Sequence, residues 1–293
     1  MSTSRITRTI PPKRLTVGRP ATRLTVGRTL KWIILAIGVI VALVPFIWMV
    51  SGSFRTESDL FHNPASLFPT SWTLHGYIGV WKQLPFLRLL LNTFIFAGVT
   101  TALCLLFDSM CAYALSRLKF RGRTLCFWLV IITLMVPFQV TLIPVFIELF
   151  HLGWLNTYQG LIIPRATSAF GIFLLRQSFM SIPTELDEAA RIDGAGHFRI
   201  YWRVILPLAK PALATVAVLN FMNLWNDLLW PLIVTSSPTM RTLPAGLTLF
   251  GGQHVIDYAV LLAGATISVL PLAIAFFLAQ RYFVAGVATT GLK

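Results

Sequence analysis

The stretch EAARIDGAGHFRIYWRVILP, from Glu188 to Pro207, is a polar and charged segment set between two long apolar runs. Its composition favours helix, Gly194 interrupts it, and the pair Leu206-Pro207 closes it. An organised polar insert in a chain that is otherwise mostly apolar is typical of a surface that contacts something outside a bilayer. We therefore expect a protein that obtains its soluble chemistry from a partner.

Composition places the chain in a membrane. Of its 293 residues, 56% are hydrophobic and 12% are charged, and its mean hydropathy is +0.75. A soluble domain has about 25% charged residues. Apolar blocks of about 18 residues or more are typical of helices that cross the hydrocarbon core. We predict an all-α integral membrane protein.

Six apolar blocks predict six transmembrane helices. The blocks are Trp32–Val50, Leu89–Leu115, Leu125–Phe150, Gln159–Met180, Ala212–Thr235 and Ala259–Phe283. Prolines inside them favour bent helices, because proline removes a backbone hydrogen bond. The first block has a basic flank like that of a signal sequence. It is too long for a signal core and lacks a small-residue cleavage site, so we interpret it as a retained span.

The basic residues that give the chain its net charge of +14 are gathered in a few segments. Eight of the 24 basic residues lie between Arg5 and Lys31, and a second acid-free cluster occupies 117–123. Lys and Arg gathered in alternate short loops follow the positive-inside rule. This pattern places both termini in the cytoplasm and the segments 51–88, 151–158 and 236–258 outside. A nucleic-acid partner is not expected, because basic residues are not interleaved with aromatics on a folded face.

The chain divides at about residue 30. Residues 1–30 form a basic tail that contains a short duplication, RLTVGR at 14–19 and again at 23–28. The tail is too poor in apolar residues to fold alone, so we predict a disordered cytoplasmic segment that contacts anionic membrane lipid. The transmembrane domain then covers residues 31–293.

Residues 181–207 predict a helix–turn–helix at the cytoplasmic surface. Thr184 and Asp187 have the spacing of a capping box, and Glu185 and Glu188 suit the positive end of a helix dipole. A plain amphipathic connector at the lipid headgroups is the alternative.

The small residues of this segment predict a close contact and a turn. Ala189 and Ala190 leave one face open to the backbone of a partner, and Gly194 permits a turn. A second helix from about His197 is then expected to stop at Leu206-Pro207.

The spacing of the segment resembles the EAA signature of permease subunits in binding-protein-dependent ABC importers. The family pattern is Glu-Ala-Ala, three residues, Gly, nine residues, Ile, one residue and Leu-Pro. Glu188-Ala189-Ala190, Gly194 and Leu206-Pro207 match it, and Val204 replaces Ile with another β-branched residue. Further stretches resemble the second permease of the maltose-type carbohydrate subgroup: RLKFRGR at 117–123, LRQSF at 175–179, WND at 225–227 and GLK at 291–293.

The resemblance implies a type I importer fold in the bacterial inner membrane and a carbohydrate, polyol or glycerol-phosphate derivative as cargo. It implies four partners: a second permease subunit, two cytoplasmic ATPase subunits and an extracytoplasmic solute-binding protein. We name residues 181–207 the coupling segment, because in the family this segment docks on the ATPase. The residues that would contribute to it are Glu188, Ala189, Ala190, Gly194, Leu206 and Pro207. Glu188 would meet a basic residue, and Gly194 would supply the bend.

The chain itself lacks motifs for catalysis. None of its six lysines precedes Ser or Thr, so it has no Walker A motif, and its five histidines have no metal-ligand spacing. Cys104, Cys111 and Cys126 show no such spacing either. We predict a non-enzymatic chain that binds no cofactor and no metal, with ATP and Mg²⁺ on the partner ATPase subunits.

Polar residues in the fifth block are candidates for a translocation path. Asn220, Asn223 and Asp227 recur at i, i+3 and i+7, with Asn226 and Trp230 close by. This spacing predicts one helical face, which would point into the bundle or a wet pathway. Interhelical hydrogen bonding without ligand contact is the alternative.

Three other features carry weaker expectations. Asp108, deep in the second block, must be paired, protonated or hydrated, and we favour a structural role for it. Glu148 lies close enough to the outer boundary to reach water. The outer loop 236–258, which contains Gly246, Gly251 and Gly252, is expected to be flexible and, by the family resemblance, to reach toward the binding protein.

Two other classes of protein remain open. A self-contained secondary transporter or channel would need an ion-coupling site and usually inverted repeats, and no convincing repeat relates the spans. A membrane-embedded enzyme would need clustered acids, bases or nucleophiles, which the spans do not offer.

Overall fold

The computed structural model describes the backbone of residues 23–248 and 257–290, and the side chains of residues 29–248 and 257–277. Within these ranges every regular element is a helix, which confirms the all-α prediction. Most of the predicted tail, the closing GLK, Gly251 and Gly252 lie outside the described residues. The chain forms two units, residues 1–47 and residues 48–293.

The helices differ widely in length. In chain order they are α1 (Arg23–Gly52), α2 (Glu57–His62), α3 (His75–Gln83), α4 (Phe86–Arg117), α5 (Arg123–Met135), α6 (Phe138–His151), α7 (Tyr158–Ile162), the 3₁₀ turn η1 (Ile163–Arg165), α8 (Ala169–Ser181), α9 (Glu185–Ile192), α10 (His197–Ile200), the π-helical turn η2 (Tyr201–Ile205), α11 (Leu206–Leu208), α12 (Lys210–Trp225), α13 (Leu229–Val234), α14 (Leu243–Leu247) and α15 (Tyr258–Thr290). The first of them begins inside the stretch assigned to the tail.

Three of these helices are long and apolar enough to cross a membrane within the described ranges: 29–52 of α1, all of α4, and 258–277 of α15. Two bent pairs bring the number to as many as five, with α5 and α6 meeting at 99° and α10–α11 meeting α12 at 79°. The predicted block 159–180 is not one helix but α7, η1 and α8 in succession. The predicted total of six spans therefore stays a prediction.

A proline explains where the predicted block 125–150 breaks. Val136 takes an extended backbone conformation before Pro137, as residues before proline do, and α6 begins directly after that proline. Pro144 and Pro271 lie inside continuous helices, so proline alone does not break a helix in this chain.

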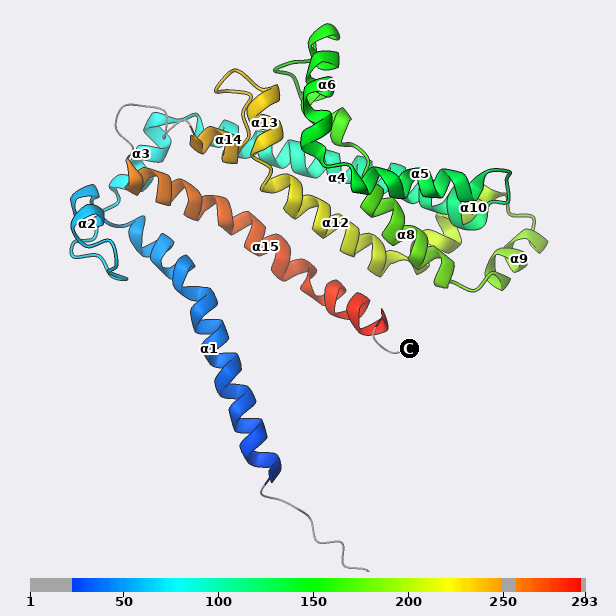
Figure 1. Ribbon diagram of the computed structural model, residues 1–293, viewed down its shortest axis with the longest axis horizontal. Helices are drawn as coiled ribbons and strands as arrows, with labels where there is room; N and C mark the ends of the chain where they lie inside the picture. The colour runs from blue at the N-terminus through cyan, green and yellow to red at the C-terminus, as the bar shows by residue number, and fades with distance from the viewer. Residues whose placement is uncertain (1–22, 249–256, 291–293) are drawn as a thin grey trace, which may run out of the picture. The chain divides into compact units, whose positions relative to one another are not determined.

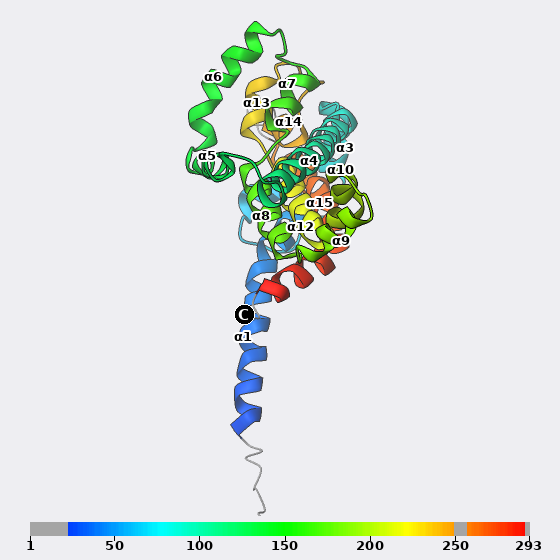
Figure 2. The same ribbon diagram turned by 90° about the vertical axis from the view of Figure 1, so that its right-hand side faces the viewer.

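In the second unit, α4 packs against α8 and α12, and α12 packs in turn against α15. Figure 1 shows these helices running side by side, and Figure 2 shows α5 and α6 standing to one side of them. At one end of this group α3 packs on α15, and at the other end α10 and η2 lie close to α9. The bundle thus presents two chemically different ends.

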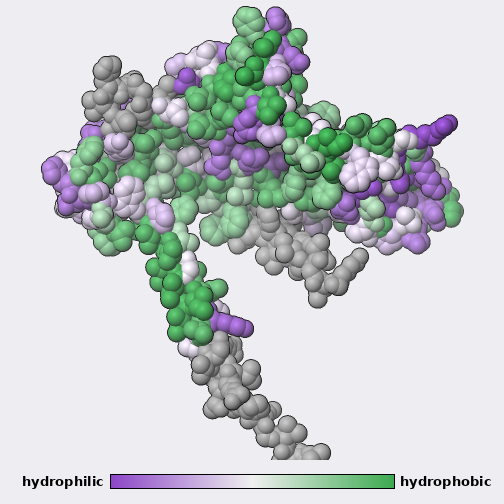
Figure 3. Space-filling view, in the orientation of Figure 1, coloured by the Kyte–Doolittle hydropathy of each residue, from purple (hydrophilic) through white to green (hydrophobic). Residues whose placement is uncertain are grey.

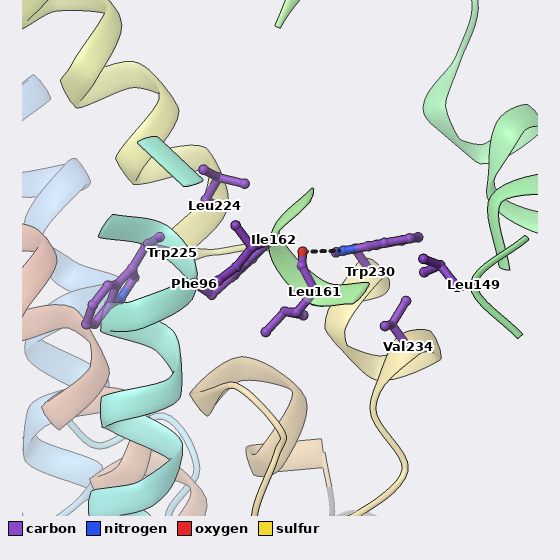
Figure 4. Packing of buried hydrophobic residues seen from close by; sticks show 9 residues of the cluster. Phe96, Leu149, Leu161, Ile162, Leu224, Trp225, Trp230 and Val234 are labelled. Atoms are coloured by element: carbon purple, nitrogen blue, oxygen red, sulfur yellow. Dashed lines mark hydrogen bonds between the residues drawn. The ribbon is translucent and has the colours of Figure 1, made fainter. Parts of the chain in front are cut away.

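One buried cluster joins the broken helices near the middle of the bundle. Trp225 at the end of α12 stacks edge-on against Phe94 of α4, with ring centroids 4.7 Å apart. Trp230 of α13 donates its indole N–H to the Leu161 carbonyl of α7 at 2.9 Å (Figure 4). The bond satisfies both polar groups inside an apolar cluster, so it fixes α13 against α7.

Candidate functional site

The coupling segment begins with α9, which ends in a Schellman motif. Gly194 has φ +77°, a left-handed conformation that a side chain disfavours. Its N–H bonds to the Arg191 carbonyl at 2.9 Å, and the Ala195 N–H bonds to the Ala190 carbonyl at 2.9 Å. The predicted turn at Gly194 is therefore present, and the positive φ explains why glycine stands there.

The second arm of the coupling segment does not stop at Pro207 as predicted. The chain stays helical through α10, η2 and α11, and it bends only at Ala209, before α12. Because Pro207 has no N–H to offer the Arg203 carbonyl, the turn before it widens, and the Leu206 N–H bonds to the Tyr201 carbonyl five residues back. Leu206 and Pro207 thus mark a widened turn instead of an end.

Aromatic packing and two hydrogen bonds hold this second arm against α4. Ile200, Tyr201 and Ile205 are buried in a cluster with residues of α4 and α8. The Tyr113 hydroxyl donates to the His197 carbonyl at 3.1 Å, and the Ser109 and Tyr201 hydroxyls bond at 2.7 Å. One face of the arm is therefore part of the bundle core, while Phe198 and Trp202 stay exposed.

A different contact holds α9. Arg117, the last residue of α4, forms an ion pair with Asp187, with 3.3 Å between Nη1 and Oδ2. Arg117 Nη2 also donates to the carbonyls of Phe179 at 2.5 Å and Ile182 at 2.6 Å. Thr184 accepts no capping bond, so the predicted capping box is wrong: the Asp187 carboxylate pairs with Arg117 instead. The sequence analysis used Arg117 for the topology and for the subgroup resemblance, and its acid-free loop gave no indication of an acid partner.

The outer face of the coupling segment is open. Glu188 and Ala189 are exposed and Ala190 is half-buried, so the Glu-Ala-Ala face is available to a partner. Ile192 is 87% exposed, which is unusual for an isoleucine. A hollow of about 670 Å³ adjoins this face; its lining is Gly194, Gly196, His197, Phe198, Arg199, Trp202 and Arg203. Figure 3 shows polar residues gathered at this end of the bundle, over α9 and α10.

The predicted polar face of α12 is only partly present. Asn220 and Asn223 lie on α12, but the helix ends at Trp225, so Asn226 and Asp227 follow it instead of continuing its face. The Asn226 amide bonds back to the Met222 carbonyl at 2.8 Å. Asn223 is exposed, and the buried Asn220 amide nitrogen has no hydrogen-bond partner among the described residues.

Asp227 pairs with an arginine that sequence reasoning missed. Arg165 of η1 lies 3.1 Å from its Oδ2, and the side chains are 19% and 12% exposed respectively. The guanidinium also sits over the Phe138 ring, 4.3 Å from its centre. Arg165 stands inside a predicted span, and an intramembrane charge needs a partner. The rule that an intramembrane charge needs a partner could therefore have predicted this pair from the sequence.

Asp108 ties α4 to the break before α8. Its Oδ1 accepts from the Thr167 hydroxyl at 2.7 Å and from the Ser168 N–H at 3.0 Å. An added Cβ at Gly171 would lie against the same carboxylate, so α4 and α8 approach closely there. The expected structural role agrees with these contacts. Glu148 is exposed, and its contact with water stays an expectation.

The described part of the outer loop is tied to the bundle. The Asn92 amide donates to the carbonyls of Thr239 and Arg241 at 2.8 and 2.9 Å, and the Leu243 N–H bonds to the Thr93 hydroxyl at 2.7 Å. Gly246, expected in a flexible loop, lies in α14 with Leu89 directly against it. These contacts hold the described part of the loop against the bundle, and its flexibility stays a prediction.

Among the described residues, no group of three or more His, Cys, Asp or Glu side chains could hold a metal ion.

Comparison with known families and structures identifies this class of molecule. Residues 105–289 match the family described as binding-protein-dependent transport system inner membrane component. The chain belongs to this family, and it is a multi-pass protein of the inner membrane.

Its relatives include permease proteins of transport systems. The chain is 36% identical over 256 residues to the arabinooligosaccharides transport system permease protein AraQ of Halalkalibacterium halodurans, covering 86% of this chain and 92% of that protein. It is 35% identical over 262 residues to the sn-glycerol-3-phosphate transport system permease protein UgpE of Yersinia pestis bv. Antiqua, covering 87% and 93%. A chain from a bacterial ABC transporter involved in the import of the acidic polysaccharide alginate superposes with a TM-score of 0.80 at 27% identity, covering 91% and 99%.

Proposed function

We propose that this chain is one of two permease subunits in an ATP-driven importer of a carbohydrate or a glycerol-phosphate derivative. The observation that carries the proposal is the coupling segment, whose Glu-Ala-Ala face is exposed on α9 while its second arm is built into the bundle core. The names of the relatives, which transport arabinooligosaccharides and sn-glycerol 3-phosphate, support the cargo class.

In this proposal the complex contains a second permease, two cytoplasmic ATPase subunits that hold ATP and Mg²⁺, and an extracytoplasmic binding protein. The ATPase subunits meet Glu188, Ala189 and Ala190, where small side chains let a backbone approach closely. Gly194 sets the angle between the docking helix and the arm that leads into α12. Both termini and the coupling segment lie in the cytoplasm, in keeping with the basic loops.

We place Asn220, Asn223, Asn226 and Asp227 along the translocation path. The free Asn220 amide and the exposed Asn223 amide are suited to sugar hydroxyls, because amides both donate and accept hydrogen bonds. Asp227 takes part through its pair with Arg165, which keeps a charged carboxylate stable near the bend after α12.

A pull-down of the tagged chain in mild detergent tests the proposal. We expect ATPase subunits to co-purify and to drive uptake after reconstitution with a binding protein. Gly194→Pro forces φ to about −65° where the chain needs a positive angle, so transport should be nearly abolished while membrane insertion continues. Full transport by Gly194→Pro would refute the coupling account, and a lone chain that transports without an ATPase would refute the proposed function.

A further inference from the structure

The two arms of the coupling segment are attached to the bundle in different ways. The second arm places Ile200, Tyr201 and Ile205 inside a buried cluster with α4 and α8, so it moves with them, whereas α9 reaches only the edge of that cluster, through the half-buried Ala190. In the part of the chain that the structure describes, Asp187 is the residue of α9 that makes a polar side-chain contact with the bundle. Gly194 separates the two arms with a turn that has no side chain to pack.

Arg117 joins α9 to the ends of two other helices. It is the last residue of α4, and its two carbonyl acceptors, Phe179 and Ile182, lie in the last turn and at the C-cap of α8. A cation is favourable at a helix C-terminus, where unpaired carbonyls and the dipole are negative. One guanidinium therefore stabilises the ends of α4 and α8 through Nη2 and its charge, and offers Nη1 to Asp187.

The ion pair is buried but singly bonded. The Arg117 and Asp187 side chains are 3% and 9% exposed, so water and salt screen the pair little. Arg117 Nε and Asp187 Oδ1 have no partner among the described residues. A single contact of 3.3 Å sets the distance between α9 and the two helix ends but leaves their angle free, unlike a two-bond fork.

We infer that the Arg117–Asp187 pair is the pivot through which movement of α9 reaches α4 and α8. The inference rests on the proposed function, in which α9 docks on an ATPase. Arg117 and Asp187 are then positioning residues: they lie away from the exposed Glu-Ala-Ala face and transmit displacement instead of binding the partner.

The test compares variants of the complete transporter, purified through a tag on this chain and reconstituted. Asp187→Asn removes the charge but leaves the bonds of Arg117 to the α8 carbonyls, so folding is preserved. Arg117→Met removes the same contact from the other side. Asp187→Glu keeps the charge, and Arg121→Met is a matched control, because Arg121 lies in the same basic loop and is exposed.

We expect Asp187→Asn and Arg117→Met to retain bound ATPase and ATP hydrolysis, while transport per ATP falls about tenfold, a typical coupling strength between sites. The double variant should be no worse than Arg117→Met alone, because the ion pair with Asp187 is already lost in that variant. Asp187→Glu and Arg121→Met should keep the same ratio of transport to ATP hydrolysis as the unmodified transporter.

Three outcomes would overturn the inference. They are an unchanged amount of transport per ATP in Asp187→Asn, losses of transport per ATP that multiply in the double variant, and loss of the bound ATPase from Asp187→Asn. If Arg117→Met fails to insert, Asp187→Asn alone decides. Failure of the unmodified complex to hold an ATPase or to show ATP-driven uptake would instead refute the proposed function.

Discussion

Buried charges in this chain are placed at helix ends. Asp108 accepts from the residues that open α8, Arg117 donates to the residues that close it, and Asp227 accepts from the Trp230 N–H near the start of α13. Carboxylates therefore stand at N-termini and the guanidinium at C-termini, which matches the sign of the helix dipole. The free backbone groups at each end give these charges partners that lipid could not supply.

Asn223 offers a test of the translocation path at the scale of one side chain. Its amide is exposed, so Asn223→Leu should leave folding and assembly unchanged. If the amide bonds to cargo, transport should fall about tenfold, because a lost hydrogen bond costs roughly 1 to 1.5 kcal/mol of binding free energy. The control is Thr215→Val on the same helix, whose hydroxyl bonds only to the Pro211 carbonyl. Undiminished uptake by Asn223→Leu would contradict the placement of Asn223 on the translocation path.

Asp59, in the segment between α1 and α4, predicts a pH dependence. The Arg55 guanidinium, 2.7 Å away, is the largest influence and holds the pKa of Asp59 well below its usual range, with help from Asn63 and Thr70. A lowered pKa in the folded state stabilises the fold above the unfolded value of about 3.9, and this contribution is lost only as pH falls through the lowered pKa.

Melting curves in detergent at several pH values measure this effect. Asp59→Asn should melt below the unmodified protein, because Arg55 loses its charged partner. The difference should stay constant between about pH 7 and pH 5 and shrink only below about pH 4. A difference that already shrinks from pH 7 to pH 5 would contradict the assignment.

At the scale of helices, hydropathy located apolar segments well but not their breaks. The predicted blocks 89–115 and 259–283 lie inside α4 and α15, because an uninterrupted apolar run has few alternatives to a long helix. Block 159–180 divides at η1, where Pro164 and Arg165 interrupt the run and Asp108 bonds to the residues before α8. That break depends on a residue of another helix, so a window moving along the chain could not detect it.

For the coupling segment, too, the local feature could be predicted and the long-range contact could not. Its turn at Gly194 was predictable, because only local backbone geometry is involved. The partner of Asp187 was not, because Arg117 is distant in sequence and reaches it only after α4 and α8 have packed. The candidate translocation residues were predicted in part. The sequence shows that they are polar, but it did not indicate that α12 ends at Trp225.

The packing of α3 on α15 gives a prediction about Gly76. A Cβ at Gly76 would lie 2.5 Å from the Ala259 carbonyl oxygen and 3.0 Å from that of Ser53. Backbone atoms cannot move aside as side chains do, so Gly76→Ala should destabilise the fold by about 1 to 3 kcal/mol.

Gly98 of α4 is the matched control, because nothing lies within 4 Å of an added Cβ there. Gly98→Ala should be neutral or stabilising by up to about 1 kcal/mol. Thermal unfolding of the two variants in detergent provides the comparison, and equal melting temperatures would contradict the close approach of α3 and α15.

At the scale of the whole molecule, the basic clusters predict an orientation. In a variant without Cys104, Cys111 and Cys126, we expect Ser71→Cys to react with a membrane-impermeant maleimide added to intact cells. Lys119→Cys should react only after permeabilisation, because its loop carries the cytoplasmic charge. Both positions are exposed, so access depends on the side of the membrane. Reaction of Lys119→Cys from outside would reverse the topology.

The left-handed backbone at Gly194 also limits how this protein can change over time. If an ATPase docks on α9 as proposed, a larger side chain at Ala189 would collide with it, and a substitution in that partner could restore the fit. Strain at Gly194 lies within the chain's own backbone, so no change on a partner's surface can relieve it. Suppressors of an Ala189 lesion can therefore arise in either gene, whereas those of a Gly194 lesion must arise in this one.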